Sequence, residues 1–179
     1  MLNKALFLDR DGVINVEENY LYKIADFKFK DGIFEVLRHF QSLKFLLVII
    51  TNQSGIARGY YTEKDFWTLT EWMVGQFLAQ GIVITKVYFS PYHPEYGLGK
   101  YKKDSNCRKP NPGMILQAQR ELNLDLTASI LVGDQETDIE AGINSGIKRN
   151  ILVNEHPLTK PTKAMTVVNS VRDLLLIEP

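Results

Sequence analysis

The chain contains 179 residues, 45% of them hydrophobic, and its 21 Lys and Arg residues equal its 21 Asp and Glu residues in number. This length fits a single domain over residues 1–179, and the lack of net positive charge argues against nucleic acid as a partner. The longest apolar run, Phe45–Ile50, is far shorter than the roughly 20 residues of a membrane-spanning helix, so no membrane partner is expected. Cys107 is the single cysteine, which excludes an internal disulfide and a metal site made of several thiolates.

The first predicted strand, residues 4–8, lies close to the start of the sequence. A secretory signal needs a basic region, an apolar region and a cleavage site, and the few residues before this strand do not supply them. We therefore expect a cytoplasmic protein.

Short apolar segments alternate with helical patterns along the chain. Strands are predicted at residues 4–8, 45–50, 83–89, 129–132 and 150–153. Helices are predicted at residues 33–43, 63–80, 111–122, 136–146 and in a short segment after residue 170. This alternation predicts an α/β fold, in which a mostly parallel sheet carries helices on both faces.

Two of these helices begin with capping residues. Thr62 precedes the second helix and has an acid, Asp65, three residues further on, which is typical of a capping box. Asn111 and Pro112 are expected to supply a cap and a first-turn proline for the helix that runs to residue 122.

Two carboxylates stand at the end of the first predicted strand. Asp9 and Asp11 follow it with one residue between them and Gly12 directly after. Ligands bind beyond the carboxyl ends of strands in an open α/β sheet, so both acids are expected to face a crevice, where a nucleophile and a proton carrier would sit. Taken alone, the Asp-Gly pair is more often a solvated turn than a catalytic site.

Three further polar clusters lie at predicted strand ends or helix starts, namely Thr51–Gly55, Arg108-Lys109 and Gly133–Asp138. Each has a structural alternative: a turn cap, a solvated loop pair and a helix cap, respectively. Their occurrence in chain order along one sheet favours a single shared crevice.

The order Asp-x-Asp-Gly-Val, Thr-Asn, Lys-Pro and Gly-Asp-x-x-x-Asp resembles the haloacid dehalogenase phosphatases over residues 4–153. The resemblance implies a Rossmann-like sheet and hydrolysis of a phosphate ester. It also implies that Asp9 attacks phosphorus to form an aspartyl phosphate, and that Asp11 protonates the leaving alkoxide and then deprotonates water. Thr51 and Lys109 would hold and neutralise the phosphoryl group.

The same resemblance implies a Mg²⁺ ion, because a carboxylate approaches an anionic phosphate poorly without a cation. Its expected ligands are Asp9, the main-chain carbonyl of Asp11, and Asp134. Asp138 lies one helical turn after Asp134 and is expected to tether Lys109 or to support a metal-bound water.

Many of these phosphatases insert a cap domain after the first or second motif, but a full cap does not fit in this chain. Only about forty residues separate Asp11 from Thr51, and these must also contain a helix and a strand. Substrate selection is therefore assigned to the loops at residues 15–29, 53–61 and 90–107. Small relatives without a cap make a monomer the default expectation.

Longer strings resemble one subgroup. Leu8–Asn15, Thr51–Gly59, Leu69–Met73 and Cys107–Met114 resemble the D-glycero-D-manno-heptose 1,7-bisphosphate phosphatases, whose near relatives are histidinol phosphate phosphatases. This implies removal of the C7 phosphate, which leaves heptose 1-phosphate for nucleotide-activated heptose and for lipopolysaccharide or related surface glycans. Histidinol phosphate hydrolysis and a non-catalytic phosphosugar-binding module are the alternative interpretations.

The subgroup also implies substrate contacts from three parts of the chain. The matching residues are Glu17, Glu18, Asn19, Tyr20, Thr51, Asn52, Gln53, Ser54, Arg108 and Lys109. Arg108 suits a bidentate grip on the remote phosphate or on sugar oxygens.

The chain departs from the subgroup in two places. Relatives typically hold the loop before Arg-Lys-Pro with Zn²⁺, through Cys-x-His and Cys-x-Cys pairs, whereas this chain has Ser90-Pro-Tyr92 and Ser105-Asn-Cys107. One thiolate among four positions does not make a tetrahedral site, so no structural zinc is expected and packing with hydrogen bonds should order this loop. Gln135 stands where heptose enzymes often have a lysine, which removes one charged contact.

Overall fold

The computed structural model describes residues 2–178 and contains one six-stranded sheet. Its strands are β1 (Lys4–Leu8), β2 (Phe45–Asn52), β3 (Ile84–Ser90), β4 (Ile130–Gly133), β5 (Arg149–Val153) and β6 (Thr166–Val168). They lie in the order β3-β2-β1-β4-β5-β6, and every neighbouring pair is parallel. The predicted α/β class with a parallel sheet is confirmed.

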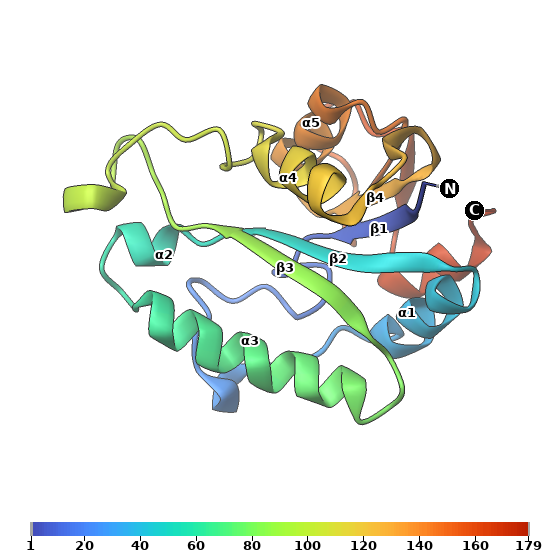
Figure 1. The fold of residues 1–179 in the computed structure, drawn as a ribbon, viewed down its shortest axis with the longest axis horizontal. Helices are drawn as coiled ribbons and strands as arrows, with labels where there is room; N and C mark the ends of the chain where they lie inside the picture. The colour runs from blue at the N-terminus through green and yellow to red at the C-terminus, as the bar shows by residue number, and fades with distance from the viewer. Residues whose placement is uncertain (1, 179) are drawn as a thin grey trace.

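Helices cover both faces of this sheet (Figure 1). The α-helices are α1 (Ile33–Ser42), α2 (Ser54–Ala57), α3 (Glu63–Leu78), α4 (Gly113–Leu122) and α5 (Glu136–Ser145). Short 3-10 helices occur at Ile24–Asp26, Gly99–Tyr101, Leu126–Ala128 and Val171–Leu176. In Figure 1, α1 and α3 lie on one side of the sheet, and α4 and α5 lie on the other.

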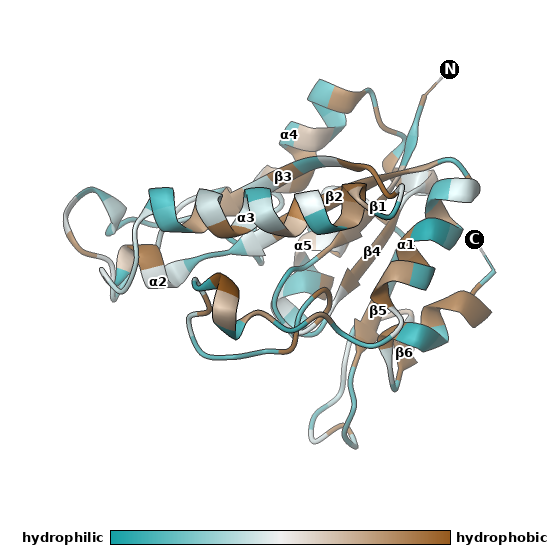
Figure 2. Cartoon of the chain, turned by 90° about the horizontal axis from the view of Figure 1, so that it is seen from below, coloured by the Kyte–Doolittle hydropathy of each residue, from teal (hydrophilic) through white to brown (hydrophobic). Residues whose placement is uncertain are grey.

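The side-chain alternation of β1 divides the core into two apolar clusters. Leu6 and Leu8 pack with residues of α1 and α3, whereas Ala5 and Phe7 pack with residues of α4 and α5. These four side chains are fully buried. Figure 2 shows that strands β4 and β5 are largely hydrophobic whereas α3 carries both apolar and polar residues. The two clusters fix the position of the end of β1, from which the first acids project.

Several boundaries differ from the sequence predictions. Asn111 does not cap α4: its side-chain amide donates to the Ser105 carbonyl at 3.1 Å, Pro112 takes the cap position, and the helix begins at Gly113. The short helix after Ser170 is a 3-10 helix, and α2 and β6 were not predicted. These last two elements have only four and three residues, too few for a periodic pattern to develop.

The capping box at the start of α3 is confirmed. The Thr62 hydroxyl accepts a hydrogen bond from the Asp65 amide at 3.2 Å, and the Asp65 carboxylate accepts one from the Thr62 amide at 2.8 Å. Two of the unpaired amides at this helix start are thereby satisfied, so the helix begins where the sequence indicates.

Polar and aromatic contacts hold the long loop at residues 90–107. The Tyr101 hydroxyl donates to Glu63 at 2.6 Å, and the Tyr101 ring lies 6.2 Å from that of Tyr92. The Cys107 thiol contacts the hydroxyls of Ser105 at 3.0 Å and Ser90 at 3.4 Å. Ser90, Ser105 and Cys107, three of the four positions compared with a zinc site in the sequence, are thus joined by hydrogen bonds.

The central strand places the chemistry-bearing segments side by side. Leu8, the last residue of β1, pairs with Ile49 of β2 on one side and with Val132 of β4 on the other. The chain builds β2 and β3 on one side of β1 before it returns to β4 on the other, and such a reversal opens a crevice at the carboxyl edge. The residues that follow β1, β2 and β4 therefore meet at one edge.

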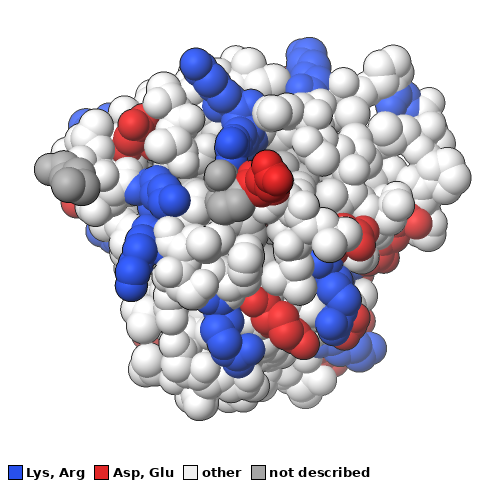
Figure 3. Space-filling model, turned by 90° about the vertical axis from the view of Figure 1, so that its right-hand side faces the viewer, with Lys and Arg blue, Asp and Glu red and all other residues white. Residues whose placement is uncertain are grey.

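The helices formed by residues 2–178 include none with both the length and the apolar character that a membrane crossing requires. On the face in Figure 3, Lys and Arg side chains lie interspersed with Asp and Glu side chains.

Candidate active site

A cavity of about 290 Å³ opens at the carboxyl ends of β1, β2 and β4. Most of the residues expected from the sequence line it. They are Asp9, Asp11, Glu17, Glu18, Asn19, Tyr20, Asn52, Gln53, Ser54, Lys109, Asp134 and Asp138. The structure therefore brings these residues together at one edge of the sheet.

Asp9 leaves one carboxylate oxygen available to the cavity. Its Oδ1 accepts hydrogen bonds from the Arg10 amide and the Lys109 ammonium, each at 2.8 Å, whereas Oδ2 has no partner within residues 2–178. The residue is only 9% exposed, and burial raises its pKa well above the usual range, with Lys109 opposing that shift and Asp138 and Asp134 adding to it. A desolvated carboxylate with one free oxygen suits nucleophilic attack.

Lys109 is a buried cation with three acceptors. Its Nζ lies 2.8 Å from Asp9 Oδ1, 2.6 Å from Asp138 Oδ1 and 3.0 Å from the Ile50 carbonyl oxygen. Burial acts to lower the Lys109 pKa, but the two carboxylates outweigh burial and raise it. The Asn52 side chain forms two hydrogen bonds with the main chain of Lys109. It accepts one from the Lys109 amide at 3.0 Å and donates one to the Lys109 carbonyl at 3.1 Å. The ammonium is thereby fixed against the nucleophile.

Asp138 anchors Lys109 with both carboxylate oxygens in use. Oδ1 pairs with the Lys109 ammonium. Oδ2 accepts a hydrogen bond from the main-chain amide of Gln135 at 3.0 Å, at the start of α5. Gly133 permits this approach, because a Cβ there would lie 2.2 Å from the Asp138 Cβ. Of the two roles expected for Asp138, this geometry favours the tether.

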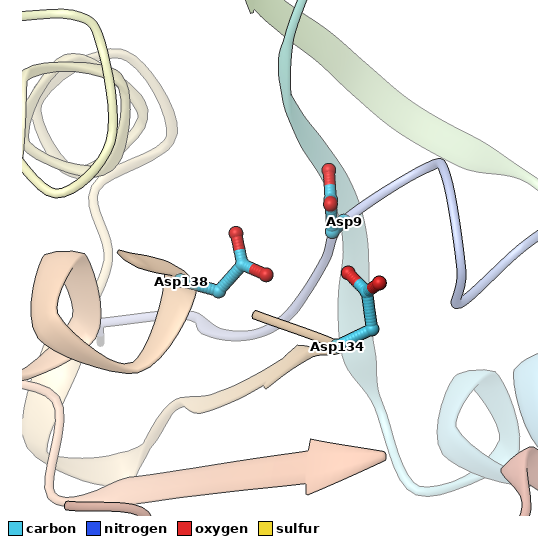
Figure 4. A group of neighbouring side chains, drawn as sticks. All are labelled: Asp9, Asp134 and Asp138. Atoms are coloured by element: carbon cyan, nitrogen blue, oxygen red, sulfur yellow. The ribbon is translucent and has the colours of Figure 1, made fainter. Parts of the chain in front are cut away.

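Asp134 completes an acidic group whose members converge from β1, β4 and α5 (Figure 4). Carboxylate oxygens of Asp9, Asp134 and Asp138 lie within 4.8 Å of one another. Asp134 Oδ2 accepts from the Gln135 side chain at 2.9 Å, but Oδ1 is buried without any hydrogen-bond partner. A buried carboxylate oxygen without a partner, within a group of converging carboxylates, suits a hard divalent cation, which prefers oxygen ligands.

The turn after Asp11 allows Asp134 to approach. Gly12 has a φ of +82°, and a Cβ at this position would lie 2.3 Å from Asp134 Oδ2. Any side chain would therefore be strained in the backbone and would collide with the carboxylate. This is the physical reason for the glycine in the Asp-x-Asp-Gly motif.

Three donors orient the Asp11 carboxylate. The Arg10 guanidinium lies 3.0 Å from both oxygens, Asn15 donates to Oδ1 at 3.0 Å, and Gln53 donates to Oδ2 at 3.0 Å. Arg10 and Asn15 were not predicted as residues of this site. Tyr61, a further unpredicted residue of the cavity, donates to the Gln53 side-chain carbonyl.

Two expected residues do not line the cavity. Thr51 is buried behind Gln53, whose side-chain amide contacts the threonine hydroxyl at 2.8 Å. Arg108 lies outside the lining and donates to the Tyr92 carbonyl at 3.2 Å.

Comparison with known proteins identifies the family. A HAD-hydrolase-like family model matches residues 106–174. The D-glycero-alpha-D-manno-heptose-1,7-bisphosphate 7-phosphatase of Burkholderia mallei is 50% identical over 98% of this chain and 93% of its own length. The D-glycero-beta-D-manno-heptose-1,7-bisphosphate 7-phosphatase of Haemophilus influenzae is 46% identical over 97% of this chain and 95% of its own length.

Solved structures agree with these relatives. The crystal structure of D,D-heptose 1,7-bisphosphate phosphatase from B. bronchiseptica, complexed with magnesium and phosphate, superposes with a TM-score of 0.79 at 26% identity. The match covers 97% of this chain and 98% of that chain. The chain therefore belongs to the haloacid dehalogenase-like hydrolases, in the family of the D-glycero-D-manno-heptose-1,7-bisphosphate 7-phosphatases.

Proposed function

We propose that this phosphatase hydrolyses the C7 phosphate of D-glycero-D-manno-heptose 1,7-bisphosphate and releases heptose 1-phosphate and inorganic phosphate. The observation that carries the proposal is Asp9, which lines the cavity and has no partner on Oδ2 within residues 2–178, while Lys109 holds Oδ1 at 2.8 Å. We take the substrate from the relatives of B. mallei and H. influenzae, which are named as heptose-1,7-bisphosphate 7-phosphatases. In this proposal the product serves nucleotide-activated heptose and surface glycan synthesis.

The proposed reaction has two displacements at phosphorus. In the first, Asp9 Oδ2 forms a bond to phosphorus as the bond to the C7 oxygen breaks, and Asp11 gives its proton to the departing alkoxide. In the second, Asp11 takes a proton from water, which attacks the aspartyl phosphate and releases phosphate. Lys109 neutralises Asp9 and the phosphoryl group, and amides near Thr51 hold phosphoryl oxygens, whereas the Thr51 hydroxyl itself is covered by Gln53.

The acidic group fits Mg²⁺, which the relative from B. bronchiseptica contains. We assign the ligands as Asp9, the main-chain carbonyl of Asp11, and Asp134, whose buried Oδ1 otherwise has no partner. Bound there, Mg²⁺ would screen the repulsion between the attacking carboxylate and the phosphoryl oxygens. Asp138 is outside the ligand set because Lys109 and Gln135 occupy its oxygens.

This assignment predicts a pH-dependent effect of Mg²⁺ on stability. Burial and the nearby Asp138 raise the pKa of Asp134 from 3.8 to about 6 in the metal-free protein. The folded state therefore binds more protons than the unfolded state between these values, and the stability contributed by protonated Asp134 is lost as the pH rises through about 6. Because protons compete with the cation, we expect saturating Mg²⁺ to raise Tm by several degrees more at about pH 7.5 than at about pH 5.

Differential scanning fluorimetry of wild-type protein and Asp134→Asn checks this prediction. The variant should lose most of the Mg²⁺-induced shift in Tm, whereas Asp104→Asn, which removes an exposed carboxylate, should keep it. An equal Mg²⁺ shift at both pH values, or a full shift in Asp134→Asn, would contradict the ligand assignment.

The segment from Glu17 to Tyr20 is proposed to contact the sugar. All four residues line the cavity. Burial, with Asp11 and Asp134 nearby, raises the pKa of Glu17 to about 7, so a large fraction of this carboxyl group is protonated near neutrality. A neutral carboxyl both donates and accepts hydrogen bonds, which suits a hydroxylated substrate.

The remaining expected contacts divide into two kinds. Gln53 and Ser54 line the cavity and stay in the proposed substrate set. Asn52 also lines it, but its amide already holds the Lys109 main chain, so its larger contribution is to position that lysine. We further propose that residues 1–179 act as one catalytic domain without a full cap and as a monomer, the default for small relatives without a cap.

Steady-state kinetics test the substrate. We expect kcat/KM with either anomer of heptose 1,7-bisphosphate to exceed that with histidinol phosphate by at least about 100-fold, because a second phosphate adds charge-assisted contacts. Preference for histidinol phosphate would keep the chemistry and overturn the substrate. Binding of the bisphosphate without turnover would instead favour a phosphosugar-binding module.

A further inference from the structure

Two arginines beside the active-site cavity have no acidic partner. Arg58 follows α2 directly, and Arg108 precedes Lys109 in the chain. Arg10, which lines the cavity, pairs with Asp11, whereas neither Arg58 nor Arg108 forms a salt bridge with any acid of residues 2–178. The Nε of Arg58 is buried and has no hydrogen-bond partner. A buried donor on an unpaired cation is costly unless a ligand satisfies it.

Aromatic and main-chain contacts hold these arginines in place. The Arg58 guanidinium lies 4.2 Å from the centre of the Tyr96 ring and 5.7 Å from that of Tyr20. The Arg108 guanidinium donates to the Tyr92 carbonyl at 3.2 Å. Stacking leaves the edge of a guanidinium free to donate hydrogen bonds. The aromatic rings therefore orient Arg58, and its N–H groups remain available to a ligand.

A main-chain hydrogen bond ties the two arginine-bearing segments together. The Leu98 amide, in the loop that precedes Arg108, donates to the Ala57 carbonyl at 2.8 Å, immediately before Arg58. Figure 1 shows this loop and α2 at the same end of the molecule. The two guanidinium groups are therefore carried by segments that are fixed to each other.

The pair forms a local excess of positive charge. Burial and the charge of Arg58 lower the pKa of Arg108, and burial with both arginines lowers the pKa of the neighbouring His93 against the opposing effect of Glu95. The face in Figure 3, by contrast, mixes both signs of charge. A multivalent anion would relieve this repulsion.

The cluster adjoins the catalytic cavity on two sides. Tyr20, which lies beside Arg58, lines the cavity, and so do Ser54 and Gly55 of α2. Arg108 immediately precedes Lys109 in the chain, and the Lys109 ammonium contacts Asp9. An anion held by the arginines would therefore lie at the mouth of the cavity, displaced from the reacting phosphorus.

We propose that Arg58 is a specificity-determining residue that, together with Arg108, binds the phosphate of the substrate that is not hydrolysed. This inference rests on the proposed function and extends it, because the subgroup resemblance assigned a substrate contact to Arg108 but none to Arg58. Two guanidinium groups offer more donors to a phosphate dianion than one, and their place next to the cavity residues favours a substrate that carries a second phosphate.

Kinetics with two substrates test the role of Arg58. We expect Arg58→Ala to raise KM for heptose 1,7-bisphosphate by about 10- to 100-fold, which corresponds to the loss of charge-assisted hydrogen bonds. With heptose 7-phosphate, which keeps the reacting phosphate and lacks the other, kcat and KM should change by less than about threefold, since the lost contact is absent from that substrate. Arg120→Ala is the matched control, because it removes an exposed arginine on α4 and should alter neither substrate.

Further variants separate binding from folding. Arg58→Lys keeps the positive charge and loses the two parallel N–H donors of the guanidinium. Its KM for the bisphosphate should therefore lie between those of wild type and Arg58→Ala. Arg58→Ala and Arg108→Ala combined should raise KM by less than the product of the single effects, because the two residues share one phosphate. Retained turnover of heptose 7-phosphate checks that each variant is folded.

The outcomes distinguish this inference from the proposed function. If wild-type protein hydrolyses the bisphosphate and Arg58→Ala leaves its KM unchanged, or raises KM equally for both substrates, the role of Arg58 is refuted and the proposed function stands. If wild-type protein does not hydrolyse the bisphosphate, the proposed function fails and this inference fails with it.

Discussion

Replacement of Asp9 by asparagine is expected to lower kcat by roughly 10⁴-fold or more, because the amide has no anionic oxygen with which to attack phosphorus. The variant should still fold. The amide oxygen can accept from the Arg10 main chain as Oδ1 does now, and Lys109 keeps its contacts with Asp138 and the Ile50 carbonyl. Burial raises the pKa of Asp9, so removal of this charge also relieves a desolvation cost.

Rapid-quench kinetics and thermal melting of Asp9→Asn check both parts of this expectation. Asp104→Asn serves as the matched control, since it makes the same chemical change at an exposed position. A variant that retains more than a few per cent of wild-type kcat would exclude Asp9 as the nucleophile. A large fall in Tm together with lost activity would instead point to a structural defect.

Replacement of Lys109 by methionine is expected to cost about 3–5 kcal/mol of unfolding free energy as well as at least about 100-fold in kcat. The lysine is only 3% exposed and pairs with Asp9 at 2.8 Å and with Asp138 at 2.6 Å. Methionine fills a similar volume without charge, so two carboxylates would be left close together without a cation. Urea denaturation measures the stability change, and steady-state kinetics measure kcat.

A double variant separates the two roles of this lysine. Lys109→Met combined with Asp138→Asn removes one of the stranded charges, and the asparagine side-chain oxygen can still accept from the Gln135 amide. We expect the double variant to regain part of the lost stability and none of the lost kcat. Recovery of kcat along with stability would mean that Lys109 only supports the fold and does not act on the phosphoryl group.

The sequence was most informative where a residue's role depends on its place in the chain. Asp9 and Asp134 each follow a buried strand, and the alternation of strands and helices was enough to place both at one edge of a parallel sheet. The free oxygen of Asp9 and the orphaned oxygen of Asp134 depend on side-chain rotamers and on neighbours distant in sequence. No local pattern encodes those contacts.

Several contacts within the site illustrate this limit. Asn52 fits a substrate contact by motif, but its amide is used by the main chain of Lys109, 57 residues away. Arg10 lies inside the first motif and still escaped the sequence analysis, since a charged residue between two acids suggests solvent exposure whereas it is 1% exposed and held by Asp11 and the Leu21 carbonyl.

Loop geometry was the least predictable part of the chain. Asn111 has the residue type of a helix cap, but tertiary structure recruits its side chain to the Ser105 carbonyl and moves the start of α4 to Gly113. The proximity of Arg58 to Arg108 likewise depends on how residues 90–107 fold back on α2. Such contacts between irregular segments leave no periodic signal in the sequence.

The stereochemical course at phosphorus distinguishes two displacements through Asp9 from a single direct attack by water. Hydrolysis of a heptose 7-phosphorothioate made chiral with oxygen isotopes should proceed with overall retention of configuration, because each in-line displacement inverts phosphorus once. Inversion would mean that water attacks the substrate directly, and it would contradict the aspartyl-phosphate mechanism.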